Sequence, residues 1–388
     1  MPMSSELKPK IRFKGFTDDW EQRKLKEMTL YKNGTGHEDK QSSNGRYELI
    51  NLNSVSIDGG LKSSGKFIDD SNETLKKNDL VMVLSDVGHG DLLGRVALIP
   101  TNNKFVLNQR VALLRPNGTI NPRFLFTCIN AGQNYFKMNG AGSSQLNISR
   151  EVVEKFEPFV PKKEEQQKIS TIFESLDNLI TLHQRKCDKL IELKKSLLEK
   201  MFPQNNSVIP EIRFKGFTDD WEQRKLGDEC FELMAGGDID KTRSVNNGKY
   251  PIYANALTNE GIVGYYNDSY RVKSPAVTIT GRGEIGYAMA RNTDFTPVVR
   301  LISLRSKHNN YFLANAINLL SVVSESTGVP QLTIPQVEKF DIYFPKKINE
   351  EIKLGRLFNE IDNLITLYQR KHDKLNKIKQ SLLNDMFV

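Results

Sequence analysis

An internal repeat constrains this chain more than any other feature of its sequence. Residues 11–25 read IRFKGFTDDWEQRKL, and the same fifteen letters return at residues 212–226. Chance cannot produce an identical match of this length, so the chain contains a duplication. Both tryptophans, Trp20 and Trp221, lie inside the two copies. The repeat therefore predicts two copies of one architecture rather than a single core built from all 388 residues.

A second repeated segment closes each half. Residues 177–190 (DNLITLHQRKCDKL) and 362–375 (DNLITLYQRKHDKL) agree at twelve of fourteen positions. Between the repeated segments the halves diverge, and DVGHG at 86–90 has no counterpart by identity in TGRGE at 280–284. The sequence thus alternates a variable module with a repeated segment, twice.

These segments divide the chain into five predicted parts. A polar stretch bounded by prolines, PQNNSVIP at 203–210, is typical of a linker. The parts are a first variable module at 1–160, a central helix at 161–202, the linker at 203–211, a second variable module at 212–345 and a C-terminal helix at 346–388.

Each variable module is predicted to mix strands and helices. β-Branched and apolar runs bounded by Gly, Asn and Pro are typical of strands. They fall at 47–57, 80–84, 95–99 and 106–114 in the first module, and at 250–254, 276–280, 286–290 and 298–304 in the second. Helices are predicted at 123–134 and 311–323. Matching tetrapeptides follow them, QLNI at 145–148 and QLTI at 331–334.

The two closing segments are predicted to form long helices with apolar seams. In the first helix, one heptad seam holds Ile169, Leu176, His183, Leu190 and Leu197, and the adjacent seam holds Ile172, Leu179, Lys186 and Leu193. In the second, the seams hold Leu354, Ile361, Tyr368, Leu375 and Leu382, and Leu357, Leu364, Lys371 and Ile378. Such a helix must bury its stripe against a partner helix, and the simplest partner is the other copy in the same chain.

Polar or bulky side chains interrupt both seams at matching places. His183 faces the position of Tyr368, and Lys186 faces that of Lys371. One interpretation is that these residues lie at the edge of the coil with their polar ends in water. The other is that they fix the register of the helices or bind a partner subunit.

The composition is that of an ordinary globular protein, with 38% hydrophobic and 26% charged residues. No apolar run of about 18 residues predicts a membrane span, and the polar start has no signal-peptide core. Cys128, Cys187 and Cys230 stand far apart, which fits a reducing cytoplasm and excludes a cysteine-based zinc site within this chain. The net charge of +8 permits a polyanion partner, but the excess is spread along the chain.

No motif predicts catalysis, a bound cofactor or a metal. The chain has no Pro-Pro pair, so it lacks the Asn/Asp-Pro-Pro-Tyr/Phe motif of amino-methyltransferases. No Gly-x-Gly pair extends to the dinucleotide-binding GxGxxG pattern, and the lysine-bearing turn at 60–66 lacks the Ser or Thr of a phosphate-binding loop. The five histidines do not stand at metal-ligand spacings.

The organisation as a whole resembles the specificity subunit of type I restriction–modification enzymes. The resemblance rests on DDWEQRKL at the start of each module, SQLNI and PQLTI near its end, and PKKEEQQKI at 161–169. YPIYAN at 250–255 and GIVGYYN at 261–267 are typical of that family's target-recognition domains. The resemblance covers residues 11–388. The second copy departs from it at KKINEE, 346–351, where the EEQ of the first copy is missing.

The resemblance implies an α+β protein with two mixed α/β target-recognition domains, separated by two long antiparallel coiled-coil helices in a pseudo-two-fold internal repeat. Each module would bind one half of a bipartite, asymmetric site on double-stranded DNA. The helices would set the half-site distance and dock two methyltransferase subunits.

The resemblance also implies which subunits carry the chemistry. The methyltransferase subunits would hold S-adenosylmethionine and methylate adenine N6, and restriction subunits would then translocate and cleave DNA with ATP and Mg²⁺. This chain would be a non-catalytic, cytoplasmic subunit with no cofactor or metal of its own.

Candidate DNA contacts are Arg, Lys, Asn, Gln and Ser residues on predicted loops, because these side chains bind phosphates and base edges. They are Lys32, Asn33, Ser85, Asn108, Arg110, Ser144 and Gln145 in the first module, and Asn255, Arg282, Arg300 and Gln331 in the second. Arg110 matches Arg300 and Gln145 matches Gln331, which suits phosphate contacts or structural roles better than specificity. The competing interpretation of each residue is a turn or a solvated surface.

Candidate partner-binding residues are His183, Lys186, Tyr368 and Lys371, and the two tryptophans are predicted to pack where each module meets a helix. Two other functions stay open at this point. A self-contained DNA-modifying enzyme would need a catalytic motif that the sequence does not contain. A coiled-coil scaffold without DNA specificity would explain the helices but not two divergent modules on repeated anchors.

Overall fold

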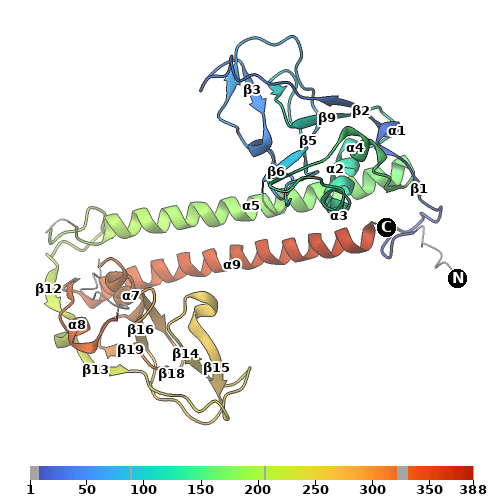
Figure 1. Cartoon of the computed structure of the whole chain (residues 1–388). Coiled ribbons are helices and arrows are strands. Elements are labelled where there is room, and N and C mark those ends of the chain that lie inside the picture. Colours follow the sequence, from blue (N-terminus) through green and yellow to red (C-terminus); the bar gives the residue numbers. More distant parts are fainter. Residues whose placement is uncertain (1–7, 88–89, 205–206, 321–330, 388) are drawn as a thin grey trace. The chain divides into compact units, whose positions relative to one another are not determined.

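The computed structural model describes residues 8–87, 90–204, 207–320 and 331–387. The chain forms two compact units (Figure 1). Unit 1 contains residues 1–182 and 371–388, and unit 2 contains residues 183–370. Each unit therefore combines one variable module with part of each long helix.

The module in unit 1 is built on a four-stranded antiparallel sheet with the order β2-β9-β5-β7. A three-stranded sheet, β4-β3-β8, and two strand pairs, β1-β11 and β10-β6, complete it. The strands are β1 Glu21–Gln22, β2 Thr29–Asn33, β3 Tyr47–Ile50, β4 Phe67–Ile68, β5 Leu80–Val83, β6 Ser85–Val87, β7 Val96–Leu98, β8 Phe105–Leu107, β9 Val111–Pro116, β10 Gln145–Asn147 and β11 Phe159–Val160. The helices are α1 Leu25–Met28, η1 Leu52–Ser54, α2 Pro122–Ala131, α3 Gln133–Met138 and α4 Arg150–Lys155.

The module in unit 2 repeats this topology with different residues. Its sheets are β13-β19-β16-β17, β15-β14-β18 and β12-β20. The strands are β12 Glu222–Lys225, β13 Cys230–Ala235, β14 Tyr250–Tyr253, β15 Ile262–Tyr266, β16 Ala276–Thr280, β17 Ala288–Arg291, β18 Thr296–Pro297, β19 Leu301–Ser306 and β20 Asp341–Phe344. The helices are α6 Leu226–Glu229, η2 Thr258–Gly261, α7 Asn310–Asn318 and α8 Ile334–Glu338. The prediction of two mixed α/β modules on one plan is confirmed.

The central strands and the covering helices explain why these segments form a core. All side chains of β5 (LVMV) and β16 (AVTIT) are buried, as expected for strands covered on both faces. Helices α2 and α7 each begin after a capping asparagine. The Asn121 side chain accepts a hydrogen bond from the Phe124 amide, and Asn309 does the same for Phe312. Both phenylalanines are fully buried.

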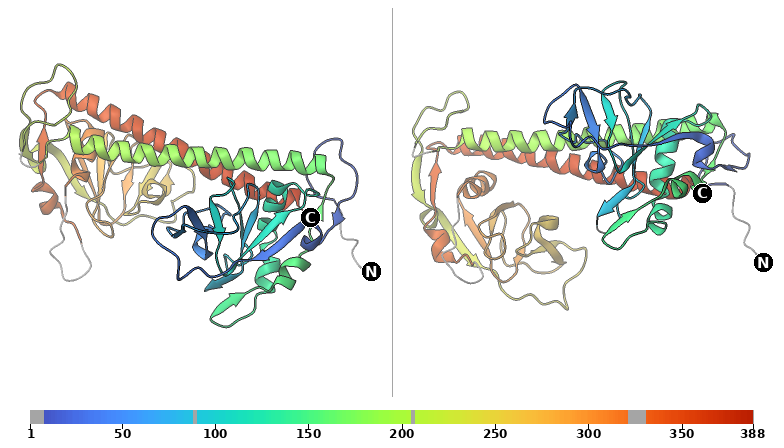
Figure 2. Two further views of the ribbon diagram at one scale, coloured as in Figure 1. Left: turned by 90° about the horizontal axis from the view of Figure 1, so that it is seen from above. Right: turned by 45° about the horizontal axis from the view of Figure 1, so that its top comes forward.

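The repeated segments form the long helices α5 (Lys163–Met201) and α9 (Ile348–Met386), each of 39 residues and about 58 Å in length. The green α5 and the red α9 lie side by side (Figure 2). In unit 1, Lys379 of α9 lies 2.7 Å from Asp177 of α5. In unit 2, the repeat-equivalent pair is Lys194 of α5 and Asp362 of α9, also at 2.7 Å. A late residue of one helix meets an early residue of the other in both units, which confirms an antiparallel pair.

The prediction for the second apolar seam is wrong. The first seam packs inward as expected, and Ile169, Leu354 and Ile361 are buried. Of the apolar residues three positions further on, Leu179, Leu193, Leu364 and Ile378 are exposed, and only Ile172 and Leu357 are partly buried. The buried neighbours lie four positions after the first seam: Phe173, Cys187, Met201, Phe358 and Met386. At Phe173, Met201, Phe358 and Met386 the step is four because these side chains also pack into the core of a module.

The ends of the long helices complete the cores of the modules. In unit 1, the Trp20 ring contacts Phe124 and Phe387 at centroid distances of 6.1 and 6.4 Å. In unit 2, Trp221 contacts Phe202 and Phe312, both at 5.8 Å. The prediction that the tryptophans pack where a module meets a helix is confirmed.

A matched ion pair fixes the start of each long helix to its module. Arg12 binds both oxygens of the buried Glu165 carboxylate at 2.7 and 2.8 Å. Arg213 binds Glu350 in the same way at 2.6 and 2.8 Å. The KKINEE segment differs in sequence from the first copy, but its Glu350 still supplies the carboxylate of this ion pair.

Several predicted element boundaries are also wrong. The strand predicted at 106–114 is two strands, because the chain turns at residues 108–110, and the strand predicted at 298–304 begins only at Leu301. The strand predicted at 47–57 ends at Ile50, where Asn51 caps the short helix η1. The helix predicted at 123–134 ends at Ala131 before Gly132. Residues 321–323 of the helix predicted at 311–323 lie outside the described residues. Among the described residues, no helix is long and apolar enough to cross a bilayer.

Candidate DNA interface

Three predicted contact residues of the second module line one cleft. Asn255, Arg282 and Arg300 surround an open cleft of about 700 Å³, together with Lys241 and Asp238. The charged residues that line the cleft within the described chain are therefore three cations, Lys241, Arg282 and Arg300, and one carboxylate, Asp238. Arginine and lysine at a concave surface are suited to phosphate oxygens and to the acceptor-rich edges of bases.

Hydrogen bonds of Asn255 hold this cleft in shape. Its Nδ2 donates to the Val299 carbonyl at 3.1 Å, and its Oδ1 accepts from the Gly281 amide at 2.8 Å. A Cβ atom at Gly281 would lie 2.2 Å from the Arg300 carbonyl oxygen, so the close approach requires glycine. Asn255 therefore joins the segments that carry Arg282 and Arg300, and most of its own hydrogen-bonding capacity is used internally.

Gln331 lies beside Arg282 at the edge of the same module. The two residues form an isolated antiparallel bridge, and the Leu332 amide donates to the Gly281 carbonyl at 3.0 Å. The side chains of both Gln331 and Arg282 are exposed. All four predicted contact residues of the second module are thus gathered at one end of its sheet.

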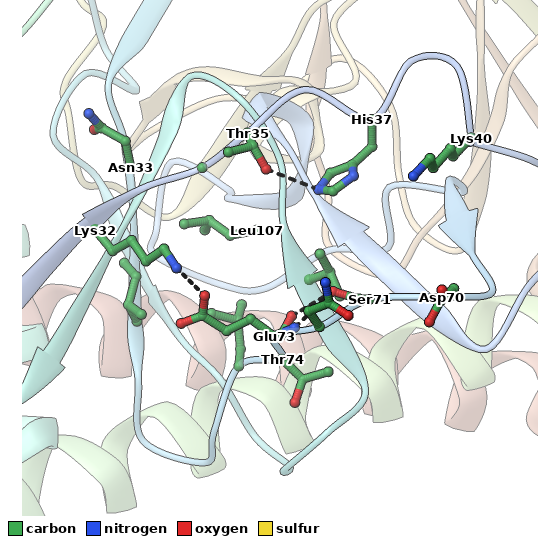
Figure 3. Close-up of a pocket in the computed structure, with 15 residues that line it drawn as sticks. Lys32, Asn33, Thr35, His37, Lys40, Asp70, Ser71, Glu73, Thr74 and Leu107 are labelled. Atoms are coloured by element: carbon green, nitrogen blue, oxygen red, sulfur yellow. Dashed lines mark hydrogen bonds and ion pairs between the residues drawn. The ribbon is translucent and has the colours of Figure 1, made fainter.

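The predicted contact residues of the first module fall into three places. Lys32 and Asn33, on β2, line a pocket of about 280 Å³ (Figure 3). The Lys32 ammonium group is paired with Glu73, and the Asn33 side chain accepts from the Tyr31 hydroxyl at 2.5 Å. His37 and Lys40, which the sequence reasoning missed, also line this pocket.

Ser85, Ser144 and Gln145 lie on or next to the two-stranded ribbon of β6 and β10. Ser85 is only 2% exposed, and its hydroxyl donates to the Asn147 side chain at 2.7 Å. The Gln145 amide donates to the same hydroxyl. Ser85 therefore holds the Gln145 and Asn147 side chains in place through hydrogen bonds and is not itself available at the surface. Ser144 is exposed in the preceding loop.

Asn108 and Arg110 occupy the turn between β8 and β9. Asn108 is 8% exposed, and its side chain accepts from the Gln109 amide at 2.9 Å, so it stabilises the turn. Arg110 is exposed and has a φ of 64°. Arg300, at the equivalent place in unit 2, has a φ of 71°. Both arginines adopt the left-handed conformation that favours glycine or asparagine.

A buried ionic cluster lies elsewhere in unit 2. The His308 ring places Nδ1 2.9 Å from Glu351 and Nε2 2.8 Å from Glu229, so both nitrogens donate and the imidazole is charged. Arg224 and Lys307 also bind Glu229, at 2.9 and 3.1 Å. Burial disfavours the charged ring, but the hydrogen bonds to Glu351 and Glu229 outweigh it and raise the pKa of His308. Burial disfavours the Glu229 carboxylate too, yet its cationic partners lower its pKa to about 2.

A family model described as the type I restriction modification DNA specificity domain matches residues 17–192 and again residues 218–377. The two matches cover most of the chain. The chain belongs to this family. Two matched domains in one chain are also what the repeat predicts, since each match contains one variable module and most of one long helix.

Relatives of this specificity subunit carry the same description. A putative type I restriction enzyme specificity subunit of Methanocaldococcus jannaschii is 23% identical over 401 residues, covering 95% of this chain and 92% of that protein. A putative type I specificity subunit of Mycoplasma pneumoniae is 27% identical over 259 residues, covering 65% and 68%. The crystal structure of the type I restriction–modification S subunit from M. genitalium has the same fold, with a TM-score of 0.76, 16% identity and coverage of 98% and 99%.

The predicted partner-binding residues of the specificity subunit lie along its long helices. In unit 2, the rings of His183 and Tyr368 are 5.6 Å apart, and the Lys186 ammonium group lies 5.2 Å from the Tyr368 ring centre. Lys186 itself is exposed, as is Lys371 in unit 1. The Lys186 ammonium group, although exposed, therefore makes a cation–π contact with the Tyr368 ring.

Four exposed leucines stand at repeat-equivalent positions of the two long helices. The sequence placed Leu179 and Leu364 in the second apolar seam, and it did not single out Leu182 and Leu367. On α5 in unit 1, Leu179 and Leu182 are 43% and 46% exposed. On α9 in unit 2, Leu364 and Leu367 are 42% and 44% exposed. Large apolar side chains at the same positions of both helices mark two equivalent apolar patches.

Proposed function

We propose that this specificity subunit recognises a bipartite, asymmetric sequence in double-stranded DNA, with each variable module contacting one half. The main support for the proposal is that equivalent positions of the two modules carry different side chains. Gln331 is paired with Arg282 in the second module, while its counterpart Gln145 is paired with Val87 in the first. One topology with different side chains at the same place is suited to the recognition of two different half-sites.

The long helices are proposed to set the distance between the half-sites and to dock two methyltransferase subunits. The duplicated patches, Leu179 with Leu182 and Leu364 with Leu367, support this part. Two copies of one partner need two equivalent surfaces, and an internal repeat supplies them. His183, Lys186, Tyr368 and Lys371 are proposed to contribute to the same docking surfaces.

The chemistry is proposed to reside in the partner subunits. Methyltransferase subunits would bind S-adenosylmethionine and methylate adenine N6, and restriction subunits would use ATP and Mg²⁺ to translocate and cleave DNA in the cytoplasm. The specificity subunit would select the site and catalyse nothing itself. The descriptions of its relatives as specificity subunits support this division.

Methylome sequencing tests the proposal directly. Cells that contain the methyltransferase partner are compared with and without this chain, and a bipartite adenine-methylated motif is expected only when the chain is present. Replacement of residues 212–345 by the corresponding module of another family member is expected to change one half of the motif and leave the other. An identical methylome in all strains would overturn the proposal.

A matched insertion tests the helical spacer. Arg185 of α5 and Arg370 of α9 are repeat-equivalent residues. Along each helix they lie between the Asp177–Lys379 pair of unit 1 and the Lys194–Asp362 pair of unit 2. One helical turn of four residues, inserted after each, keeps both ion pairs in register and separates His183 from its contact with Tyr368. The gap between the two half-sites is expected to lengthen, whereas an unchanged gap would show that the helices do not set it.

A further inference from the structure

Two turns share one unusual backbone geometry although their sequences differ. Arg110 is the third residue of the turn Asn108-Gln109-Arg110-Val111, and Arg300 is the third residue of Val298-Val299-Arg300-Leu301. In the second turn the Leu301 amide donates to the Val298 carbonyl at 3.0 Å. A positive φ at this position is the requirement of a type II turn, which glycine or asparagine normally meets. Both modules instead place an arginine there.

The surrounding structure holds each turn in this conformation. The Gly34 amide donates to the Val111 carbonyl at 2.9 Å, and the Gly236 amide donates to the Leu301 carbonyl at 2.7 Å. A Cβ atom at Gly34 would lie 1.8 Å from the Asn108 carbonyl oxygen, and one at Gly236 would lie 2.0 Å from that of Val298. A glycine therefore lets the neighbouring segment cross each turn closely. Unfavourable backbone conformations persist where neighbours determine them, and they cluster at functional sites.

The two guanidinium groups have no structural task within the described residues. Arg115 and Arg305, five positions further along each strand, bind Asp79 at 2.8 Å and Glu232 at 2.7 Å. Arg110 and Arg300 make no such ion pair in the described part of the chain. Arg110 is exposed, and Arg300 lines the cleft that also contains Arg282. Each module thus contains an arginine in an unfavourable backbone conformation that makes no ion pair with the described residues of its unit.

We propose that Arg110 and Arg300 are equivalent contacts to DNA backbone phosphates, one in each module. This inference rests on the proposed function of the modules in DNA recognition. A phosphate contact carries no sequence information, so two modules that read different bases can share it. A base contact would be expected to differ between them, as Arg282 and Val87 do. The shared arginine fixes how each module sits on the duplex, and other side chains select the bases.

Glycine substitutions separate this role from a structural one. The complex with the methyltransferase partner is prepared with Arg110→Gly, Arg300→Gly and both changes. Its affinity for a duplex with the methylated motif and for a scrambled duplex is then measured over a series of salt concentrations. Each single change is expected to reduce the slope of log K against log salt by about 0.9, the value for one phosphate contact, and the double change by about twice that. Affinity falls by the same factor on both duplexes, and the methylated motif stays unchanged.

The melting temperature supplies the structural readout. Glycine removes the unfavourable conformation, so neither variant is expected to melt at a lower temperature than the wild-type chain. Arg110→Lys and Arg300→Lys keep the charge and are expected to retain the wild-type slope. Asn103→Gly, which changes a left-handed turn residue with a φ of 57° but removes no charge, is the matched control and should leave the slope unchanged.

Four results would overturn the inference. A changed methylated motif would mean that the arginines read bases. An unchanged slope would exclude a phosphate contact, and a lower melting temperature of the glycine variants would assign the arginines a structural role. A wild-type complex that binds neither duplex would overturn the proposed function itself, and this inference with it.

Discussion

The indole ring of Trp20 meets the ring of Phe387 edge-on, with the centroids 6.4 Å apart and the planes at 87°. Phe387 also stacks on Phe124 at 5.7 Å, inside the core of the first module. The second module has the same arrangement, with Phe202 stacked on Phe312 at 5.5 Å. The core of each module is therefore completed by an aromatic residue that follows the long helix of the other half.

Loss of this aromatic residue is expected to destabilise one unit at a time. Phe202→Ala should lower the free energy of unfolding of unit 2 by about 3–5 kcal/mol, the usual cost of removing a buried phenylalanine. Phe387→Ala should act on unit 1 and cost less, because Phe387 is only half-buried. Amide hydrogen exchange of the whole chain resolves the two units. Phe231→Ala, at a side chain that is 65% exposed, is the control and should change neither by more than about 0.5 kcal/mol.

The bidentate pairs Arg12–Glu165 and Arg213–Glu350 are expected to be equally important for their units. Glu165→Ala leaves Arg12 without its carboxylate in a nearly buried position, which typically costs about 3–5 kcal/mol. Glu350→Ala should have the same effect on unit 2, as measured by urea unfolding. Glu151→Ala, which breaks an exposed ion pair with Lys155, should cost less than about 1 kcal/mol. Similar costs for all three variants would contradict this prediction.

The stability of unit 2 is expected to depend on pH through His308. Because the pKa of His308 is raised in the folded state, its stabilising effect is complete below the ordinary value of 6.5 and is lost as pH rises through the folded value. Because the pKa of Glu229 is lowered from 4.5 to about 2, its effect is complete above 4.5 and is lost as pH falls towards 2. Unit 2 should therefore be most stable between pH 4.5 and 6.5.

Unit 1 provides the internal control for this pH dependence. Its corresponding buried residues, Met28, Ile120 and Gln166, carry no charge. Hydrogen exchange above neutral pH should show a loss of stability in unit 2 that unit 1 does not share, after correction for intrinsic exchange rates. His308→Gln should lower the stability of unit 2 near pH 6 and abolish its decline at higher pH. A decline that persists in this variant would assign the pH dependence to another group.

The exposed leucine pairs are expected to determine how many partner subunits bind, which follows from the proposed docking role. Leu179→Ser with Leu182→Ser should leave one methyltransferase subunit on the chain. Changing Leu364 and Leu367 as well should leave none, as measured by native mass spectrometry. Ile191→Ser is the matched control, because Ile191 is exposed but its repeat equivalent is Asn376. Two bound subunits in every variant would contradict the docking role.

Much of the architecture could be predicted because the repeat implies two copies of one fold. Identical letters at 11–25 and 212–226 imply equivalent environments, and the matched pairs Arg12–Glu165 and Arg213–Glu350 bear this out. The helix seams could be predicted only in part. Leu179 and Phe173 are both apolar and stand near the same seam, so hydropathy alone does not show that one is exposed and the other buried.

The candidate site was harder to predict because polar letters do not reveal burial. Ser85 and Asn108 look like surface contacts in the sequence, yet hydrogen bonds to Gln145, Asn147 and Gln109 hold them inside. In the second module the four predicted residues do converge, because Asn255 links segments that lie far apart in the sequence. The conformation of Arg110 and Arg300 could not be predicted, since neither is a residue that normally adopts a positive φ.

The packing of Phe387 against Trp20 also sets an order of events during protein synthesis. Phe202 leaves the ribosome before Trp221, so Phe202 is already available for packing while the strands of the second module are still being synthesised. The strands of the first module are complete long before Phe387 is translated. Domains usually finish folding in the order in which they are synthesised. Because Phe387 packs on the core of the first module, we expect this module to finish folding last, and an incomplete nascent chain to lack its final form.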